Sequence, residues 1–414
     1  MRKKRSYSEL ETHIHLTPYT LHLTPITFTK SMFSKIPKNI FVLGLVSFLT
    51  DVSSDMIYPI LPVFLSDVLG ASKLFIGLIE GIAESTASIL KVFSGWLSDK
   101  LGKRKILVSL GYGLSSLGKP ILSIVTAGWQ VLVLRFMDRF GKGVRTSPRD
   151  AMIADSSLSE RRGLSFGFHR AMDSGGAVLG PLLGFLFLPL VNRNYRTLFL
   201  IASIPAFLSV LLLILFVREK KKAKEKISGL AKPKFSGFDR KFKIFVFGVT
   251  IFTLGNSSDA FLFLRAKGLS IDVVYIPILW LVLNAVYTLV SLPAGWLSDR
   301  IGRKNLILSG LFVYALVYLG FAFATRSYHA WLLFAVYGLY YGLANGTMRA
   351  HVADLVKEEK RATAYGIYHG AVGITALPAS LIFGWLWQSV GVSFAFCFGA
   401  GLASLAFIII RFGL

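Results

Sequence analysis

Long apolar runs alternate with short charged or turn-forming segments along most of the chain. Each run approaches or exceeds the roughly 20 residues that an α-helix needs to cross the hydrocarbon core of a bilayer. The pattern therefore predicts twelve transmembrane helices. Their expected ranges are 39–66, 74–97, 105–126, 129–150, 163–190, 196–217, 243–264, 272–297, 305–324, 329–350, 362–388 and 391–411.

The twelve runs fall into two sets of six, separated by a basic linker at 218–242 that is too charged to bury. This division predicts an N-terminal six-helix bundle at 39–217 and a C-terminal six-helix bundle at 243–414. Residues 1–38 lack the apolar stretch of a secretory signal, and we expect them to form a disordered cytoplasmic tail. Within this tail, residues 1–31 are either an extension of the native protein or lie upstream of a natural start at Met32.

The two sets of runs also repeat each other. Three short motifs recur about 200 residues later, which indicates two homologous bundles of parallel topology, as in transporters that rock about a site near the midplane. The matching pairs are Gly95-Trp-Leu-Ser-Asp99 with Gly295-Trp-Leu-Ser-Asp299, Ser53-Ser-Asp55 with Ser257-Ser-Asp259, and Ile153-Ala-Asp155 with Val352-Ala-Asp354.

Composition supports an all-α membrane protein. Of the 414 residues 54% are hydrophobic and only 16% are charged, against roughly 25% charged in soluble domains. A soluble enzyme is excluded, and we expect no enzymatic activity and no cofactor. With Cys397 as the one cysteine, no intramolecular disulfide can form, and the sequence contains no metal-ligand spacing.

The net charge of +24 could indicate a nucleic-acid partner. Most of the Lys and Arg residues, however, fall in alternate loops, which is typical of the cytoplasmic loops of a multi-pass membrane protein. We therefore expect no nucleic acid, and we expect both termini to lie in the cytoplasm.

The segments Gly95–Lys105 and Gly295–Lys304 resemble the signature of the major facilitator superfamily, Gly-x-Leu-x-Asp-Arg-x-Gly-Arg/Lys-Arg/Lys. The resemblance implies a fold of two pseudo-symmetric six-helix bundles that transports by alternating access. It also implies that Asp99 ties its loop to a neighbouring helix and to a basic residue, for which Arg145 and Arg149 are candidates. The gate motif comprises Gly95, Asp99, Gly102, Arg104, Gly295, Asp299 and Gly302.

A second resemblance lies in the fifth predicted span. Gly176, Gly180, Pro181 and Gly184 are similar to the Gly-x-x-x-Gly-Pro-x-x-Gly-Gly motif of drug/proton antiporters of that family, although Phe185 replaces the last glycine. The alternative is close helix packing with a proline kink.

Carboxylates inside predicted spans are functional candidates because an ionised group in hydrocarbon is costly. Asp51 and Asp55 lie four residues apart in the first span, and Glu80 and Glu84 repeat the spacing in the second. Two charges ~6 Å apart at an effective dielectric of ~20 repel by roughly 3 kcal/mol, so we expect at least one carboxyl to exchange protons. Asp259 matches Asp55 in the second half and completes the set of proton-coupling candidates.

Further intramembrane residues are candidates for substrate binding or for a charge network. A family-typical Arg in the fourth span is expected in an Arg-x-x-Gln-Gly setting, but here Asp138 and Arg139 stand in place of Gln and Gly. The alternative, for these residues and for the carboxylates of the first two spans, is a structural ion pair within the bundle, in which Lys91, Arg135, Arg139 and Arg170 are the candidate partners of the acids. The candidates are Arg135, Asp138, Arg139, His169, Arg170, Asp173, Trp280 and Asn284, and the last two lie opposite Glu80 and Glu84 in the repeat.

Together these patterns predict a monomeric secondary transporter of a bacterial cytoplasmic membrane. Its expected partners are the lipid bilayer, a small-molecule substrate and protons. The leading form is proton antiport that exports a drug-like compound or a metabolite. One alternative is proton-linked uptake of an organic anion, which Arg135, Arg139 and Arg170 favour. The other is a sensor or scaffold of the same fold, which would tolerate loss of the intramembrane acids.

Overall fold

The computed structural model describes residues 36–101, 103–158, 161–219, 237–357 and 360–414. Residues 37–414 cluster as one unit, and the helices of the described residues lie within it. The predicted tail, apart from its last three residues, and most of the predicted linker lie outside the described residues, so their expected disorder stays a prediction.

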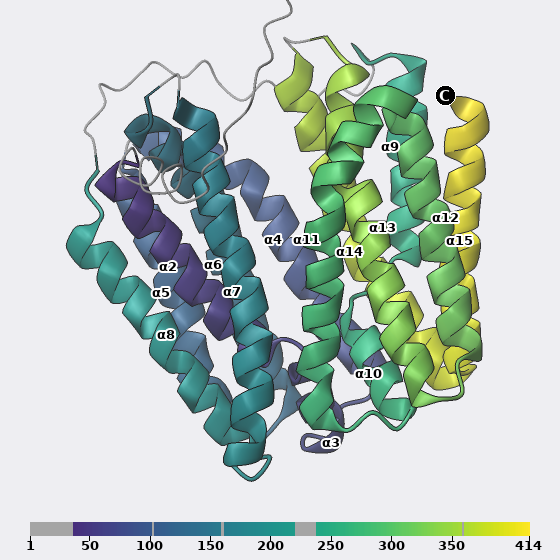
Figure 1. The fold of residues 1–414 in the computed structure, drawn as a ribbon, viewed down its shortest axis with the longest axis horizontal. Helices are drawn as coiled ribbons and strands as arrows, with labels where there is room; N and C mark the ends of the chain where they lie inside the picture. The colour runs from purple at the N-terminus through teal and green to yellow at the C-terminus, as the bar shows by residue number, and fades with distance from the viewer. Residues whose placement is uncertain (1–35, 102, 159–160, 220–236, 358–359) are drawn as a thin grey trace, which may run out of the picture. The chain divides into compact units, whose positions relative to one another are not determined.

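Each of the twelve predicted ranges contains at least one helix, and the described residues contain no strand. The N-terminal half, drawn in purple to teal in Figure 1, consists of α2 (Lys38–Ile57), α3 (Leu61–Asp67), α4 (Lys73–Leu101), α5 (Arg104–Leu122), α6 (Gly128–Ser156), α7 (Arg162–Leu190) and α8 (Tyr195–Phe216). The C-terminal half, drawn in green to yellow, consists of α9 (Arg240–Gly255), α10 (Ala260–Gly268), the short 3-10 helix η3 (Val273–Tyr275), α11 (Ile276–Ile301), α12 (Arg303–Phe323), α13 (Ser327–Asp354), α14 (Arg361–Ser389) and α15 (Val392–Gly413).

Eight segments of the described chain are long and apolar enough to cross a membrane. They comprise α2 with α3, α7, α8, α9 with α10, η3 with the first part of α11, α12, α14 and α15. The other four predicted spans correspond to α4, α5, α6 and α13, which are less apolar. All four helices contribute to the lining of the central cavity between the two halves: α4, α5 and α6 on the N-terminal side, and α13 through Tyr341 on the C-terminal side.

The first predicted span of each half is interrupted in the structure, which differs from the single helices expected over 39–66 and 243–264. In the first half, Pro59 lies in the break between α2 and α3, and Pro62 lies in the first turn of α3. Proline lacks the N–H that would continue the helical ladder. In the second half, the polar segment 256–259 separates α9 from α10. There Ser258 Oγ accepts a hydrogen bond from the Ala260 amide at 3.3 Å, a local bond that competes with the helix.

The two halves meet along two helix pairs, α4 with α14 and α7 with α11. The repeat relates α4 to α11 and α7 to α14, so the two pairs are equivalents in a pseudo-two-fold arrangement. Glycines bring the α4 and α14 backbones together: a Cβ at Gly77 would meet the Ser380 carbonyl oxygen, and one at Gly384 would lie 2.6 Å from the Lys73 carbonyl oxygen. Small residues of this kind allow close approach of membrane helices.

One end of the unit is closed by contacts between the halves. There α3 packs against α10, and Lys267 pairs with Asp67. Arg193 pairs with Asp272 at 3.0 Å. We call this the α3/α10 end, and we call the opposite end, where α2 begins and α15 finishes, the terminus end (Figure 1).

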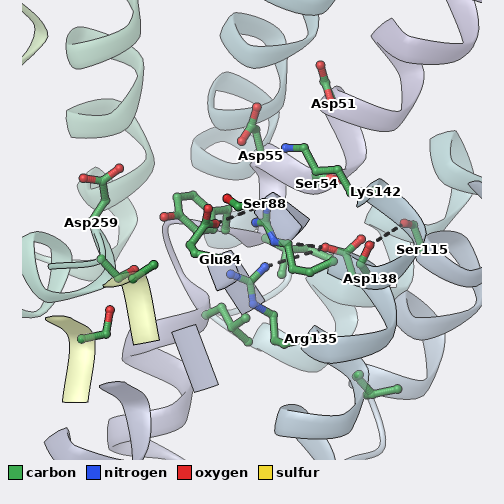
Figure 2. A pocket seen from close by; sticks show the side chains of 18 of the residues that line it. Asp51, Ser54, Asp55, Glu84, Ser88, Ser115, Arg135, Asp138, Lys142 and Asp259 are labelled. Carbon is green, nitrogen blue, oxygen red and sulfur yellow. Dashed lines mark hydrogen bonds and ion pairs between the residues drawn. The ribbon is translucent and has the colours of Figure 1, made fainter. Parts of the chain in front are cut away.

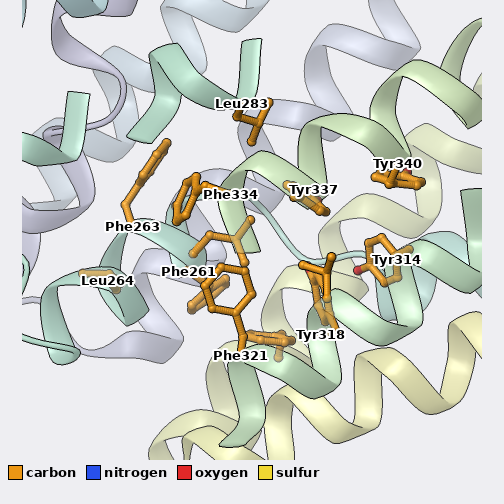
Figure 3. Packing of buried hydrophobic residues seen from close by; sticks show 14 of the residues in the cluster. Phe261, Phe263, Leu264, Leu283, Tyr314, Tyr318, Phe321, Phe334, Tyr337 and Tyr340 are labelled. Carbon is orange, nitrogen blue, oxygen red and sulfur yellow. The ribbon is translucent and has the colours of Figure 1, made fainter. Parts of the chain in front are cut away.

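The C-terminal half has an aromatic core (Figure 3). Tyr314 stacks on Tyr318 with ring centroids 4.2 Å apart, and Phe263 stacks on Phe334 at 5.8 Å. These rings are almost fully buried. They pack around the break between α9 and α10, where Tyr314 donates a 3.0 Å hydrogen bond to the Gly255 carbonyl oxygen and so satisfies backbone that the interrupted helix leaves unpaired.

Candidate functional site

A cavity of about 460 Å³ lies between the two halves. Its N-terminal wall comes from α2, α4, α5 and α6, and its C-terminal wall from the α9–α10 break, α11, α13 and α14 (Figure 2). Broken helices near such a cavity are the structural mark of transporter binding sites, because their free backbone groups and polar side chains face the solute.

The structure brings eight of the thirteen predicted intramembrane residues to the lining of this cavity. They are Asp51, Asp55, Glu84, Arg135, Asp138, Arg139, Asp259 and Trp280. Glu80, His169, Arg170, Asp173 and Asn284 lie outside the lining.

Asp55 and Asp51 project from α2 into the cavity (Figure 2). Trp280 of the opposite half donates its indole N–H to Asp55 Oδ1 at 3.4 Å. Within the described chain, no Lys, Arg or His nitrogen lies within 4.0 Å of either carboxylate. Both groups are therefore carboxyls without a direct cationic partner.

The glycine motif of α7 allows this helix to pack closely against the part of α2 that carries Asp51 and Asp55. A Cβ at Gly176 would lie 2.6 Å from the Phe48 carbonyl oxygen and 2.8 Å from Asp51 Cβ. At Gly180 it would lie 2.7 Å from the Val52 carbonyl oxygen and 2.9 Å from Asp55 Cβ. Gly184 lies against Met56 one turn later, and Pro181 is accommodated within the helix. The motif thus packs α7 directly behind the Asp51–Asp55 face, as the packing interpretation of the sequence expects.

Asp259 is the counterpart of Asp55 in the second half. It lies at the break before α10 and accepts hydrogen bonds from Tyr337 at 3.1 Å and Tyr341 at 3.0 Å. Like Asp55, it has no cationic nitrogen of the described residues within 4.0 Å. The repeat therefore places one carboxyl of this kind on each side of the cavity (Figure 2).

The remaining acids of α4 and α6 belong to an ion-pair network. Glu80 is only 1% exposed and accepts three hydrogen bonds of 2.6–3.0 Å from the Arg135 guanidinium. Arg139 lies more loosely, 3.6 Å from both Glu84 and Asp138. The structural alternative thus applies to Glu80 and Arg135, whereas Glu84 also keeps nearly half of its side chain exposed to the cavity.

The other predicted residues make contacts outside the cavity lining. His169 and Asp173 face each other on α7 at 3.6 Å. Arg170 reaches across to the other half and donates to the Tyr287 hydroxyl at 3.2 Å. The Asn284 side chain donates to the Trp280 carbonyl oxygen at 2.9 Å within α11. These contacts link the two halves or stabilise the helices behind the cavity.

The two signature loops are tied to the ends of α6 and α13. Arg104 pairs with Asp155, and Arg303 pairs with Asp354 at 2.7 Å and with Asp299 at 3.7 Å. Gly302 has a φ of +88°, which favours glycine at this turn, and Gly295 has open space around it. A Cβ added at Gly95 would lie 3.6 Å from Ser147 Cβ of α6, which is an ordinary van der Waals contact.

The gating role of these loops stays a prediction, and two parts of the gate motif cannot be placed. The side chain of Asp99 and the whole of Gly102 lie outside the described residues. The candidate partners of Asp99 have other contacts: Arg145 donates to Ser115 at 2.5 Å, and Arg149 pairs with Asp150 at 2.9 Å.

Sequence reasoning did not single out Tyr58, Lys119 or Lys142 as site candidates, although all three line the cavity. Lys119 donates to the Ser53 and Ser54 hydroxyls at 2.6 and 3.1 Å. Tyr58 lies beneath the guanidinium groups of Arg135 and Arg139, 5.5 and 6.0 Å from its ring centroid. The available signal was the position of both lysines within predicted spans, where a charge is costly.

Two repeated helical halves, with broken first helices and a charged cavity between them, are the architecture of membrane transporters built from internal repeats. Two stretches of the chain, residues 43–287 and 244–414, match the family model described as Major Facilitator Superfamily. The chain belongs to the major facilitator superfamily.

Individual relatives agree with this assignment. An MFS-type transporter of Methanocaldococcus jannaschii is 40% identical over 385 residues, which cover 91% of this chain and 95% of the relative. Multidrug resistance protein MdtG of Enterobacter lignolyticus is 26% identical over 72% of this chain and 73% of its own length. The crystal structure of nucleoside transporter NupG superimposes with a TM-score of 0.73 at 16% identity, over 90% of this chain and 98% of the other. This last likeness concerns the fold.

Proposed function

We propose that this transporter is a proton-coupled antiporter of the cytoplasmic membrane that exports a small drug-like compound or metabolite. In this proposal the protein works as a monomer, both termini lie in the cytoplasm, and the cavity opens alternately to the two sides. Asp55 is the principal proton carrier, with Asp51, Glu84 and Asp259 as further candidates.

One observation carries the proposal: Asp55 and Asp259 are symmetry-related carboxyls that face one cavity without a cation within 4.0 Å in the described chain. An isolated carboxylate in a poorly solvated cavity is costly unless a proton or a cationic ligand neutralises it. A proton and a solute that neutralise the same group compete for it, and this competition is the thermodynamic basis of antiport. The similarity to a multidrug resistance protein supports export as the direction.

Uptake of an organic anion together with protons is the second candidate. Lys119, Lys142 and Arg145 line the cavity, and none has a carboxylate oxygen of the described residues within 4.0 Å. Protonation of the neighbouring acids would leave these cations uncompensated and would favour an anion. Proton and solute would then move in the same direction.

The experiment that tests antiport uses everted vesicles with an acidic interior, reported by a quenched pH dye, to which a compound panel is added. At least one compound is expected to relieve the quenching in wild type but not in Asp55→Asn, because an amide cannot carry the proton. Asp239→Asn is the matched control, since Asp239 is exposed and lies outside the cavity.

Antiport is contradicted if Asp55→Asn responds like wild type, or if no compound relieves the quenching while folded protein is present. The uptake candidate makes the opposite prediction. In right-side-out vesicles, addition of the transported anion would alkalinise the external medium.

A further inference from the structure

The two walls of the cavity differ in chemistry. The N-terminal wall supplies all of the Lys and Arg side chains of the lining, together with four of its acids. The C-terminal wall supplies one carboxyl group, Asp259, among hydroxyl, amide and aromatic side chains such as Thr253, Asn256, Tyr341 and Trp280. The charges of the cavity are therefore distributed unevenly, because its cationic side chains all lie on the N-terminal side.

Two cations of the N-terminal wall keep donors that the described protein does not use. Arg139 Nε is buried without a hydrogen-bond partner, and its nearest carboxylate oxygens lie 3.6 Å away, beyond the 2.7–2.9 Å typical of charge-assisted hydrogen bonds. Lys142, one turn further along α6, lines the cavity with no carboxylate oxygen of the described chain within 4.0 Å. Arg135, in contrast, donates three charge-assisted hydrogen bonds to Glu80 through Nε and Nη2.

The C-terminal wall, in contrast, has hydrogen-bond acceptor sites that the described protein does not use. Asp259 accepts two tyrosine hydroxyls, but an ionised carboxylate offers about four acceptor sites, so about half of them stay available. Its tyrosine partners hold the group in one orientation at the cavity surface. The rings of Tyr341 and Trp280 line the same wall, and the face of an aromatic ring attracts a cation within about 6 Å.

We propose that the transported solute is zwitterionic, with an anionic group bound by Arg139 and Lys142 and an organic ammonium group bound by Asp259. This inference rests on the proposed function of solute transport and names the class of substrate. Figure 2 shows Asp259 on the ribbon opposite the one that carries Asp138 and Lys142, so one solute would bridge the two halves. A cavity of about 460 Å³ falls within the range of small-molecule sites, about 300–1,000 Å³.

The solute class also fits the energetics of the cavity. A zwitterion satisfies the unused donors and the unused acceptor sites at once and adds no net charge to a poorly solvated space, whereas a simple cation or anion leaves the other group uncompensated. The ammonium group and a proton would compete for Asp259, which is consistent with exchange of one for the other.

The test measures equilibrium binding to the purified protein in nanodiscs, at one pH and without a gradient. The probes are ω-amino acids of increasing chain length, each compared with the n-alkylamine and the n-alkanoate of the same length. At least one ω-amino acid is expected to bind about tenfold more tightly than both of its matched compounds, equivalent to about 1.4 kcal/mol. Equal affinity across the matched compounds, or no binding by any ω-amino acid, overturns the inference.

Two variants assign the ends of the solute. Asp259→Asn is expected to weaken binding of that ω-amino acid about tenfold and to leave the alkanoate unaffected, and Lys142→Gln is expected to leave the alkylamine unaffected. Tyr341→Phe keeps the ring but removes one hydrogen bond to Asp259, so it tests the ammonium end if Asp259→Asn does not fold. The matched controls are Asp239→Asn and Lys241→Gln, both at exposed positions. An intact Asp55-dependent proton response to other compounds, together with no preference for zwitterions, would refute this inference and leave antiport standing.

Discussion

Glu80 and Glu84 show how two residues of one type, one helical turn apart, acquire different roles. Glu80 is 1% exposed and saturated by Arg135, whereas the Glu84 side chain is 46% exposed and lies 3.6 Å from Arg139. A buried charge whose partner is removed is strongly destabilising. Glu80 is therefore expected to stabilise the fold, whereas Glu84 is available to bind a solute or a proton.

Glu80→Gln is expected to lower the free energy of unfolding by roughly 3–5 kcal/mol, because it leaves the Arg135 guanidinium buried without its counter-charge. Thermal unfolding in detergent or nanodiscs measures this loss. The double variant Glu80→Leu/Arg135→Met removes both charges and is expected to recover most of the stability. An unchanged melting temperature in Glu80→Gln would show that the ion pair contributes little.

At this scale, the sequence predicts which residues are candidates but not which partners they have. The spacing of Asp51 with Asp55 and the match of Asp55 with Asp259 single out three acids, and all three line the cavity, while their role in proton coupling stays a prediction. The rotation of each helix about its axis depends on long-range packing, so the pairing of Glu80 with Arg135 and the exposure of Lys142 could not be derived. For the same reason His169 and Asp173, which share a helix face as expected, lie outside the cavity lining.

At the scale of helices, α7 positions the aspartates of α2 through its glycines. The two helices lie so close at Gly176 and Gly180 that a side chain at either position would overlap the α2 backbone. The outer ends of the helices agree with the predicted ranges to within six residues, because apolar runs and flanking charges are local properties. The helix breaks at 58–60 and 256–259 were not predicted. The apolar pattern continues across the first break, and the second is stabilised by tertiary packing, which the local sequence pattern does not show.

Gly180→Ala is expected to destabilise the protein by about 1–3 kcal/mol, the usual cost of overpacking, and to impair the proton movement that we propose Asp55 carries. The added Cβ would lie 2.7 Å from the Val52 carbonyl oxygen. Gly167→Ala is a matched control on the same helix, because its Cβ would meet nothing within 4 Å. That control is expected to be neutral or to stabilise by about 0.5–1 kcal/mol. Equal melting temperatures for the two variants would argue against close packing as the role of the motif.

At the scale of the whole molecule, ion pairs between the halves hold the α3/α10 end shut. Asp67 and Lys267 are about one-third exposed, and Arg193 and Asp272 are more exposed still. Pairs of this exposure contribute about 0.2–1 kcal/mol each. They are therefore weak enough to break during a transport cycle, yet strong enough to bias which end is closed.

Lys267→Gln is expected to increase opening at the α3/α10 end by about two- to fivefold, the population change that corresponds to about 0.5–1 kcal/mol. The assay measures labelling of Ala376→Cys, a cavity-lining position, by an impermeant maleimide added at that end, in a Cys397→Ser background. The charge-reversed double variant Asp67→Lys/Lys267→Asp is expected to restore the slow labelling. Unchanged labelling in Lys267→Gln would exclude a latch at this position.

The glycine seam between α4 and α14 has a mechanical consequence. Its tightest contacts, at Gly77 and Gly384, lie near the α3/α10 end of helix α4, which runs from Lys73 to Leu101. At about 1.5 Å per residue, the lever from Gly77 to Leu101 is ~36 Å long, whereas the lever from Gly77 to Lys73 is only ~6 Å. Rocking about this fulcrum would sweep the terminus end through a much wider arc than the α3/α10 end. Pairs of spin labels at the terminus end would therefore follow the cycle with the larger change in distance.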